Sequence, residues 1–247
     1  MKRLYLIVRG HERGACLKPD FANFKERVAS ECSAAGAELE IHVHTWCESE
    51  AKTSHRPLDR RGVRAITERD IREYIGGRVC SVAVEDDARL SLRGRLEGRI
   101  GGIPVRAWKN MWHGIAAATA AASNSNSAAG VPDVDALAVC VRLDVFSNLE
   151  SRVVTKITED RIVEMVRDML ARGRRPGGVY FFSDNEIPGI DNCFAGRLSA
   201  VKRLVDRFNL ELDDLAKAYP EVHHQEFMVF REAQKLERAH NILGQGF

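Results

Sequence analysis

Three segments within the first fifty residues alternate between the pattern of a buried strand and that of an amphipathic helix. Leu4 to Val8 is a continuous apolar run, which is typical of a strand buried on both faces. Apolar residues then recur at helical spacing from Asp20 to Ala35, with Asp20 placed to cap this helix and Gly36 placed to end it. Leu39 to Trp46 is a second strand. A strand, a helix and a strand in this order predict a right-handed crossover in a parallel sheet.

The alternation of strands and helices continues through the first two thirds of the chain. Further strands are predicted at 79–84, 137–143, 153–157 and 179–182, and helices at 67–75, 108–122, 158–171, 191–207, 211–218 and 220–240. The first of these helices opens with a capping box, Thr67-Glu-Arg-Asp70. Between the elements we expect a long loop at 47–66, a hairpin or irregular excursion at 88–106 and a mobile polar connector at 123–127. The pattern predicts an α/β fold, a Rossmann-like and mostly parallel sheet flanked by helices, with a helical C-terminal tail.

Size, charge and cysteine usage exclude several classes of protein. The 247 residues fit a single domain, and 37 basic against 35 acidic residues give no reason to expect a nucleic-acid partner. No two of the six cysteines share a C-x-x-C spacing, which indicates reduced thiols. The apolar start of the chain ends at Arg9, too early for a signal peptide, and no apolar run approaches the ~20 residues of a membrane helix. We therefore expect a cytoplasmic protein with no transmembrane segment.

Polar side chains follow the predicted strands, where a parallel sheet gathers its ligand sites. They are Arg9, Gly10, His11 and Arg13 after the first strand, His44, Thr45 and Trp46 at the end of the second, Asp86 and Asp87 after the third, Arg142 and Asp144 after the fourth, and Asp184, Asn185 and Glu186 after the sixth. Cations suit a diphosphate, an aromatic ring can stack on a base, and carboxylates can hold a divalent cation or move a proton. The set predicts a nucleotide site along one edge of the sheet; the alternative is that these are simply polar turns.

Three acidic and basic side chains in the second half of the chain are candidates for the chemistry. Arg142 and Asp144 point to the same side because side chains alternate along a strand. The carboxylate could hold Mg²⁺ or Mn²⁺ that bridges two phosphates while the arginine helps to neutralise them; an ordinary ion pair is the alternative. Asp191, at the start of a predicted helix, is either an N-cap or a functional carboxylate, which would act as a general base or bind the substrate.

A second possible metal site comes from the histidines. His42 and His44 form an H-x-H pair on one face of the second strand, a spacing that also occurs in metal-dependent hydrolases. His11 follows the neighbouring strand and could complete a zinc site. No H-E-x-x-H motif accompanies the pair.

Two residues of a later helix are candidates for substrate contacts. Trp112 lies one helical turn after Trp108, so both rings share one face of the helix. The rings either pack in the core or stack on a base or sugar. Lys109, on the same helix, is a candidate for contact with a phosphate.

The order of these motifs resembles that of a known family. Arg9-Gly10-His11-x-Arg13, His44-Thr45-Trp46, Ser54-x-Arg56 and Trp108-Lys-Asn-x-Trp112 resemble a family of bacterial and large-DNA-virus proteins of the glycosyltransferase class. Val141-Arg142-Leu-Asp144, followed by Gly189-Ile-Asp191-Asn-Cys-Phe-Ala-Gly196, resembles lipopolysaccharide and capsule glycosyltransferases of the GT-A fold. The resemblance covers roughly residues 3 to 200 of the chain.

The resemblance implies a GT-A-like domain and assigns roles to single residues. Asp144 stands where the family has the last acid of its metal-binding D-x-D motif, which implies Mg²⁺ or Mn²⁺ as the cofactor. Arg142 replaces the first acid, and this departure puts metal dependence in doubt because an arginine cannot ligate a cation. Asp191 matches a later aspartate, the catalytic base of an inverting transfer. Residues 1–122 would form the nucleotide-binding half, and 131–247 the half with the metal and acceptor sites and the helical tail.

We therefore expect a glycosyltransferase of polysaccharide biosynthesis, which moves a sugar from a nucleoside-diphosphate donor to a glycan or glycoconjugate acceptor. The expected substrate-binding residues are Arg9, Gly10, His11, Arg13, His44, Thr45, Trp46, Arg56, Asp86, Lys109, Trp112 and Arg142. Two alternatives stay open, a metal-dependent hydrolase built on the H-x-H pair and a non-catalytic module that binds a nucleotide or a glycan. The expectation requires four residues from distant parts of the chain to meet around one cleft: Arg9, Trp46, Asp86 and Asp144.

Overall fold

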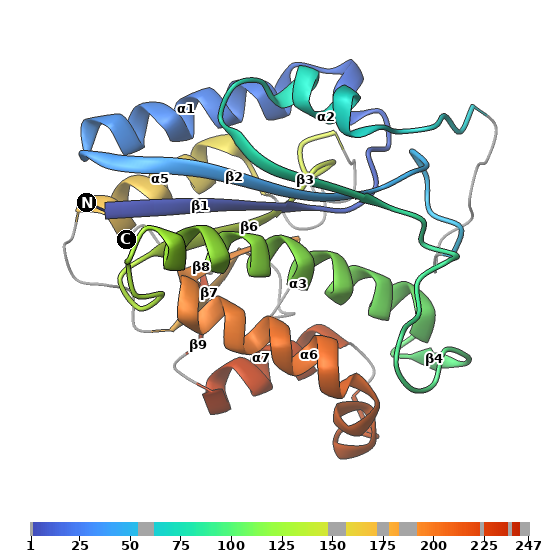
Figure 1. The fold of residues 1–247 in the computed structure, drawn as a ribbon. Helices are drawn as coiled ribbons and strands as arrows, with labels where there is room; N and C mark the ends of the chain where they lie inside the picture. Colours follow the sequence, from blue (N-terminus) through green and yellow to red (C-terminus); the bar gives the residue numbers. More distant parts are fainter. Residues whose placement is uncertain are drawn as a thin grey trace.

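The structure, a computed structural model of the chain, describes residues 2–53, 62–147, 157–171, 178–182, 192–222 and 225–236, and the backbone of 239–242. Its centre is a seven-stranded sheet in the order β3-β2-β1-β6-β8-β7-β9 (Figure 1). The strands are β1 (Lys2–Arg9), β2 (Ala37–Trp46), β3 (Val79–Glu85), β6 (Leu137–Arg142), β7 (Val179–Phe182), β8 (Cys193–Arg197) and β9 (Ala239–Ile242).

Six of the seven strands run in the same direction. β2 and β6 pair in parallel with β1, and β3 pairs in parallel with β2. β8 is antiparallel to both of its neighbours, β6 and β7, and β9 is parallel to β7. The predicted α/β fold with a mostly parallel sheet is therefore confirmed, and the carboxyl ends of β1, β2, β3 and β6 lie along one edge.

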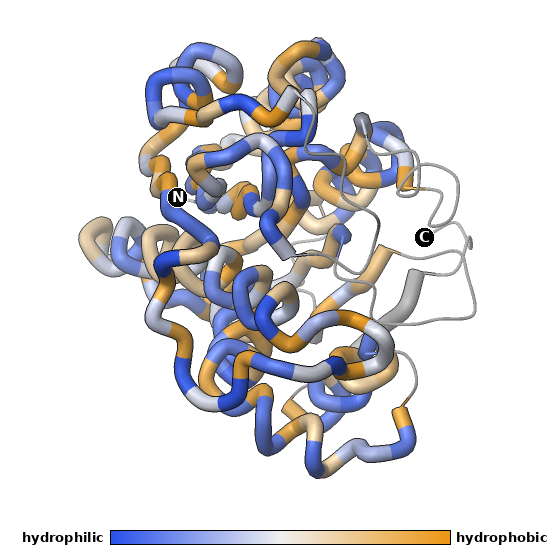
Figure 2. The backbone as a smooth tube through the Cα atoms, turned by 90° about the vertical axis from the view of Figure 1, so that its right-hand side faces the viewer, coloured by the Kyte–Doolittle hydropathy of each residue, from blue (hydrophilic) through white to orange (hydrophobic). Residues whose placement is uncertain are grey.

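Helices cover both faces of the sheet (Figure 1). One face carries α1 (Asp20–Ala34), α2 (Glu68–Ile75) and α5 (Glu159–Ala171), and the other carries α3 (Val105–Ala128), α6 (Leu198–Ala218) and α7 (Gln225–Leu236). β1 contributes to both cores because its side chains alternate: Leu4, Leu6 and Val8 pack toward α1, and Tyr5 and Ile7 pack toward α3. Hydrophilic and hydrophobic residues alternate along the outer helices (Figure 2), as expected of helices with one buried face.

The starts of the first two helices differ in how they are capped. Thr67 and Asp70 form the predicted capping box of α2: Thr67 N donates to Asp70 Oδ2 at 2.8 Å and Asp70 N donates to Thr67 Oγ1 at 3.3 Å. The prediction that Asp20 caps α1 is wrong, because Asp20 is already the first helical residue and Pro19 takes the cap position without a side-chain bond. An acidic residue in the first turn still interacts favourably with the helix dipole.

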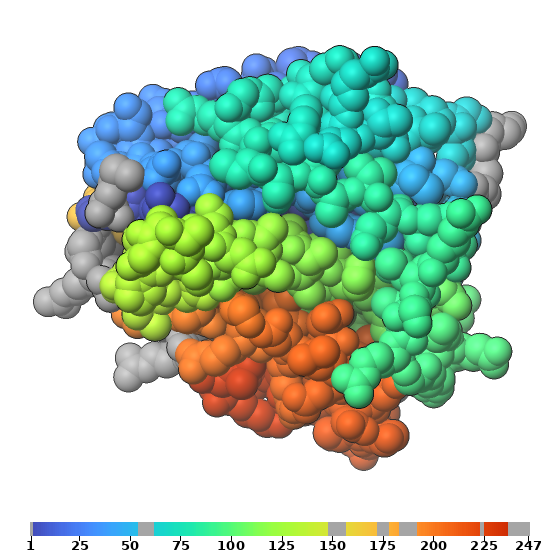
Figure 3. Space-filling view, viewed as in Figure 1, coloured from blue at the N-terminus to red at the C-terminus, as the bar shows by residue number. Residues whose placement is uncertain are grey.

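The polar segment Ser123 to Ser127 is not a connector. It forms the last turns of α3, which runs as one band between the β3 side of the sheet and α6 (Figures 1 and 3). Asn126 is buried there and accepts a hydrogen bond from Tyr5 Oη at 3.1 Å, while its Nδ2 donates to Val131 O at 2.8 Å. The low-complexity composition suggested mobility, but these buried hydrogen bonds fix the segment.

The last third of the chain contains more strand than the sequence predicts. The helix expected at 191–207 begins only at Leu198, because Cys193–Arg197 is the antiparallel strand β8. The two helices expected at 191–207 and 211–218 are joined in one helix, α6, with a kink at Glu211. The tail expected to be helical up to 240 ends with β9 at the sheet edge. Of the strand expected at 153–157, residues 153–156 lie outside the described part of the chain.

Residues 88–104 are mostly irregular and contain the short hairpin of β4 (Arg99–Ile100) and β5 (Ile103–Pro104), as one of the two expectations had it.

All six cysteines are unpaired thiols. Among the helices that the structure describes, none combines the length and the apolar composition needed to cross a membrane.

Candidate functional site

The candidate site lies at the carboxyl ends of β1 and β6, where the strand order reverses. β2 and β3 lie on one side of β1, and β6 lies on its other side. In open α/β sheets, ligands bind beyond the carboxyl ends of the strands at such a switch point. Arg9 and Arg142 are register partners at these two ends, and Leu143 N donates to Arg9 O at 2.9 Å just beyond them. The topology therefore places two arginines at the position where a ligand is expected.

Four residues at the switch point, Arg9, Arg13, Arg142 and Asp144, form what we call the arginine cluster. Arg142 binds both oxygens of Asp144, with Nε 2.8 Å from Oδ1 and Nη2 2.6 Å from Oδ2. Arg13 Nη1 donates to the same Oδ2 at 3.3 Å, and Arg13 Nε donates to Glu50 Oε1 at 2.9 Å. The Asp144 side chain is 2% exposed, whereas that of Arg13 is 25% exposed. Two guanidinium groups, those of Arg13 and Arg142, thus bind Asp144, and the third arginine, Arg9, is the register partner of Arg142 on the neighbouring strand.

The loop after β1 holds Arg13 in a strained backbone conformation. Arg13 has a φ of 46°, the only positive value outside glycine in the described ranges, and it lies between Gly10 at 104° and Gly14 at 75°. Its amide donates to Ser49 O at 2.9 Å, which ties the loop to the segment after β2. Strain of this kind costs roughly 1–3 kcal/mol and occurs most often at functional sites. The contacts around the loop thus direct Arg13 toward Asp144 at the expense of backbone energy.

The end of β2 is packed against the loop after β1. The rings of His11 and Trp46 are stacked with centroids 5.6 Å apart, and Thr45 Oγ1 donates to Gly10 O at 2.8 Å. His11 Nε2 lies 3.6 Å from Asp87 Oδ2, and burial lowers the pKa of His11. Trp46 is itself buried beneath His11, so its role here is packing, and stacking on a base would require His11 to move.

Asp86 lies at the same edge but faces a lysine. Lys52 Nζ is 2.5 Å from Asp86 Oδ1, and the hydrogen bond from this lysine lowers the pKa of Asp86. Lys52 N also donates to Asp87 Oδ2 at 3.0 Å. Of the four residues expected to meet, Arg9 and Asp144 therefore belong to the arginine cluster, while Trp46 and Asp86 lie at the ends of β2 and β3.

His44, Glu85 and His113 form what we call the histidine cluster. His44 Nε2 lies 2.8 Å from Glu85 Oε2, and His113 Nε2 lies 2.6 Å from the same oxygen. They come from three elements, since His44 is on β2, Glu85 ends β3 and His113 is on α3. His44 is fully buried, and burial lowers its pKa; the hydrogen bond from His44, with that from His113, lowers the pKa of Glu85 to about 2.

A glycine in the middle of α3 makes room for the histidine cluster. A Cβ atom on Gly114 would lie 2.6 Å from His44 Nδ1, closer than real Cβ contacts allow. Glycine inside a helix costs about 1 kcal/mol relative to alanine. Gly114 therefore lowers the stability of the helix next to His113, but because it has no side chain, His44 can lie directly beneath α3.

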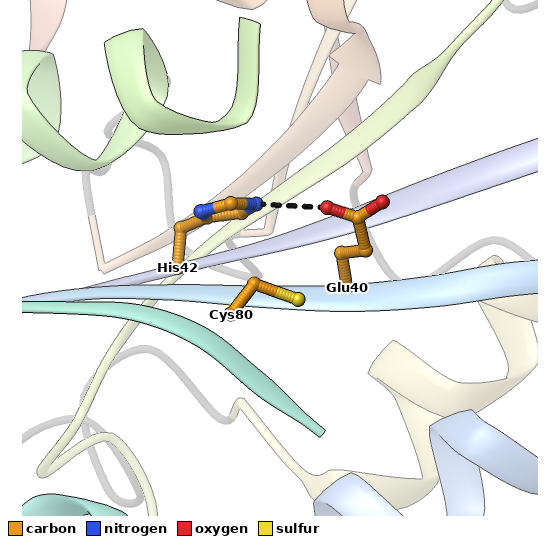
Figure 4. Close-up of side chains that lie close together, drawn as sticks. All are labelled: Glu40, His42 and Cys80. Carbon is orange, nitrogen blue, oxygen red and sulfur yellow. Dashed lines mark ion pairs between the residues drawn. The ribbon is translucent and has the colours of Figure 1, made fainter. Parts of the chain in front are cut away.

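His42 does not join His44 in one site. It belongs to a separate group with Glu40 and Cys80 (Figure 4), in which His42 Nε2 is 3.4 Å from Glu40 Oε2. His42 Nδ1 lies 2.8 Å from Ser81 Oγ. Arg3 already pairs with Glu40 Oε1 at 2.7 Å. The single H-x-H metal site that the spacing suggested, with His11 as a third ligand, is therefore wrong: side chains two apart on β2 share a face but meet different partners.

Lys109 and Trp112 lie between α3 and α6, away from the arginine cluster. The ring of Trp112 is fully buried and stacks on Phe208 with centroids 4.5 Å apart. Lys109 Nζ pairs with Asp213 Oδ2 at 2.8 Å and donates to Arg93 O. Trp112 therefore packs in the core, which was the alternative to stacking on a base or sugar. Lys109 links α3 to α6 and to the loop that contains Gly94.

Several predicted residues lie outside the described part of the chain. They are Arg56, Asp184, Asn185, Glu186 and Asp191. The chain neighbour of Asp191 is described, and it contacts the arginine cluster: Arg142 Nη1 donates to Asn192 Oδ1 at 3.0 Å and Arg142 N donates to Asn192 O at 3.2 Å. The described part of this motif, from Asn192 on, thus begins next to the cluster.

The described residues around Asp144 do not fit Mg²⁺ or Mn²⁺. These cations take oxygen ligands, but both oxygens of Asp144 are bonded to guanidinium groups, which repel a cation. Asp144 also belongs to neither group of three or more His, Cys, Asp and Glu side chains found close together within the described ranges. The arrangement suits an anion that competes with Asp144 for the arginines.

Two residues of the histidine cluster were not predicted as site residues. Glu85 is the first of three consecutive acids at the end of β3, and only the two that follow it, Asp86 and Asp87, were selected at this strand end. His113 directly follows Trp112, so the helical spacing that drew attention to the tryptophans placed this histidine on a different face. The sequence offered only the order of the elements, in which the helix follows β3; that α3 packs beside β2, which makes a polar residue in its first half a partner for β2, is seen only in the structure.

The chain is thus an α/β protein with polar clusters at the carboxyl edge of a mostly parallel sheet. No protein-family model matches it, and no match is found among curated proteins or among solved structures.

Proposed function

We propose that this protein is a glycosyltransferase that uses a nucleoside-diphosphate sugar and holds the diphosphate on the arginine cluster. The observation that carries the proposal is that Arg13 and Arg142 bind the same buried aspartate at the switch point of the sheet, where Arg9 is in register with Arg142. Arginine presents a planar set of donors that matches phosphate oxygens, and its charge persists at any physiological pH. A diphosphate is the ligand class that best suits several arginines at a switch point.

The fold supports the proposal at a coarser level. The expected GT-A-like domain is a mostly parallel sheet flanked by helices, and the chain has that architecture. Three of the motifs that resemble glycosyltransferases also meet in space, since Arg142 is in register with Arg9 and in contact with Asn192, the residue after Asp191. The order of motifs and their proximity are independent observations.

In the proposed reaction, an acceptor hydroxyl loses its proton and attacks the anomeric carbon as the bond from that carbon to the diphosphate oxygen breaks. The departing diphosphate gains negative charge, and the preorganised guanidinium groups stabilise it. Arg142 is positioned for this by Asp144 and Asn192, and Arg13 by Glu50. Asp191 is the proposed base, on the basis of its motif and of its place next to Asn192. No divalent cation at Asp144 takes part.

A thermal-shift screen with UDP-, GDP-, CMP- and dTDP-sugars, each with Mn²⁺ or with EDTA, tests the proposal. We expect one donor class to raise the melting temperature in EDTA as well as in Mn²⁺, because a ligand at 100 times its Kd stabilises by about 2.7 kcal/mol. Arg13→Gln should abolish the shift, and Arg142→Lys should weaken it because lysine lacks the planar pair of donors that a guanidinium presents to phosphate oxygens. Arg167→Gln, at an exposed pair with Glu31, is the matched control and should keep the full shift. No shift with any donor would overturn the proposal.

A non-catalytic binding module remains the second candidate, because Asp144 is held by arginines and is not open to a metal. The module would show the same thermal shift without turnover. Release of the nucleoside diphosphate from the shifting donor, measured with a coupled assay in the presence of mixed glycan acceptors, separates the two. Turnover that is lost in Asp191→Asn with the thermal shift retained would support the transferase.

A further inference from the structure

The histidine cluster has the composition of a metal site and a different position from the arginine cluster. His44 and His113 each direct Nε2 at one oxygen of Glu85, and all three ligand atoms lie within 4.8 Å of one another. Two histidines with one glutamate are a ligand set of catalytic zinc sites, and two histidines with a carboxylate also bind ferrous iron. The cluster lies at the ends of β2 and β3, beside Trp46, which is the register partner of Glu85.

The surroundings of Glu85 suit a cation. Within the described ranges Glu85 pairs only with the two histidines and with no lysine or arginine. Around a tetrahedral zinc with bonds of about 2.0–2.1 Å, neighbouring ligand atoms lie roughly 3.3 Å apart. The present contacts of 2.8 and 2.6 Å reach that spacing when the side chains separate by about 0.5 and 0.7 Å.

One side of the cluster is fixed and the other is open. His44 is fully buried beneath α3, in the space that Gly114 leaves. The side chains of Glu85 and His113 are 37% and 29% exposed. A bound cation would therefore keep positions for water or for a ligand on the solvent side, which is the arrangement of a catalytic site more than of a closed structural one.

The other group of possible ligands fits less well. Glu40 already pairs with Arg3 through one oxygen and accepts from Ser125 Oγ at 2.6 Å through the other (compare Figure 4). A guanidinium on the carboxylate neutralises the charge that a cation would need. Of the two groups, the histidine cluster is therefore the better candidate for a metal site, because its carboxylate pairs with no arginine among the residues that the structure describes.

We propose that His44, Glu85 and His113 bind one divalent transition-metal ion of the zinc class, with at least one coordination position open to solvent. The site does not depend on the proposed donor, because it shares no residue with the arginine cluster.

The experiment is a titration of the tag-free, EDTA-treated full chain with Co²⁺ and Zn²⁺, followed by visible absorption of Co²⁺ and by isothermal calorimetry. We expect one equivalent to bind, with Co²⁺ absorption typical of nitrogen and oxygen ligands, and Zn²⁺ to displace Co²⁺. His113→Ala and Glu85→Gln should each lower the affinity at least about tenfold, which is a change of about 1.4 kcal/mol. Circular dichroism checks that both variants fold, and the half-exposed His113 makes that variant the safer one.

Cys80→Ser, in the other group, is the matched control and should bind as the wild type does. The proposal is overturned if the wild type gives neither absorption nor heat, if both cluster variants bind like the wild type, or if Cys80→Ser alone loses the metal. Thermal shifts by nucleotide sugars in EDTA are measured on the same variants. A shift that persists while metal binding is lost separates this site from the proposed transferase function.

Discussion

Two carboxylates at the same edge of the sheet, Asp144 and Glu85, have opposite surroundings. Asp144 is bonded by Arg142 at both oxygens and by Arg13 at one, with almost no exposure. Glu85 faces two imidazole rings through one oxygen and is partly exposed. An aspartate fixed among permanent cations suits an anion site, whereas a glutamate that faces two imidazole rings suits a cation site. The comparison shows that the neighbours of an acid, more than its presence at a strand end, decide which ligand it serves.

The largest expected effect comes from removing the carboxylate of the arginine cluster. Asp144→Ala leaves Arg142, whose side chain is only 13% exposed, without its bidentate partner, and breaking a largely buried ion pair in this way costs about 3–5 kcal/mol. Urea denaturation followed by circular dichroism measures the loss. Glu73→Ala, which removes an exposed pair with Arg69, is the control and should change stability by less than about 1 kcal/mol. A similar small loss for Asp144→Ala would mean that the arginine cluster is not preorganised by this carboxylate.

The sequence predicted those elements of the fold whose local residue pattern is enough to define them. The apolar runs of β1, β2, β3, β6 and β7 and the capping box of α2 were found because each signal is local. β8 was missed because Cys193-Phe-Ala is a short apolar run at a predicted helix start, and only its pairing with β6 and β7 makes it a strand. The segment Ser123 to Ser127 was missed because its helical state depends on partners such as Tyr5, which is far away in sequence.

The candidate site was predictable in its position and less so in its contacts. The sequence pointed to Arg9, Arg13, Arg142 and Asp144 because ligands of a parallel sheet bind beyond the carboxyl ends of its strands, and the predicted strands suffice to locate those ends. The sequence could not show that Asp144 is saturated by arginines, since those bonds join residues up to 131 positions apart. It also could not separate His42 from His44, because a shared strand face does not specify what lies across from it.

The next largest effect concerns the space beneath α3. Gly114→Ala should destabilise the protein by about 1–3 kcal/mol, because the added Cβ would meet His44 at 2.6 Å and overpacking outweighs the better helix propensity of alanine. Thermal denaturation measures the change. Gly77→Ala, where a Cβ meets nothing within 4 Å, is the control. In a His44→Ala background the same Gly114→Ala change should become neutral or stabilising, and a persistent loss there would refute the steric explanation.

The same chemical change at both carboxylates should have opposite effects on binding. Asp144→Asn weakens the competitor for Arg13 and Arg142, so pyrophosphate should bind about tenfold tighter, or about 1.4 kcal/mol. Glu85→Gln should lower Co²⁺ affinity at least about tenfold and leave pyrophosphate binding unchanged. Isothermal calorimetry on both variants with both ligands gives all four values. Equal responses of the two variants to either ligand would remove the distinction between the clusters.

The smallest effect is the response of the two regions to mild acid. Burial lowers the pKa of His11, His42 and His44, so the unfolded chain, with an ordinary histidine pKa near 6.5, binds protons that the folded chain does not. The part of the stability that depends on these histidines is then fully present above pH 6.5. It decreases as the pH falls from 6.5 through the lowered pKa values of the folded chain. Nearby carboxylates raise each of these pKa values again in part, which keeps the effect small. Melting temperatures in EDTA from pH 8 to pH 5.5 should decrease, and less steeply in His42→Gln. Arginine keeps its charge over this range, so a melting temperature that stayed constant would show that the arginine cluster, and not the histidines, governs stability there.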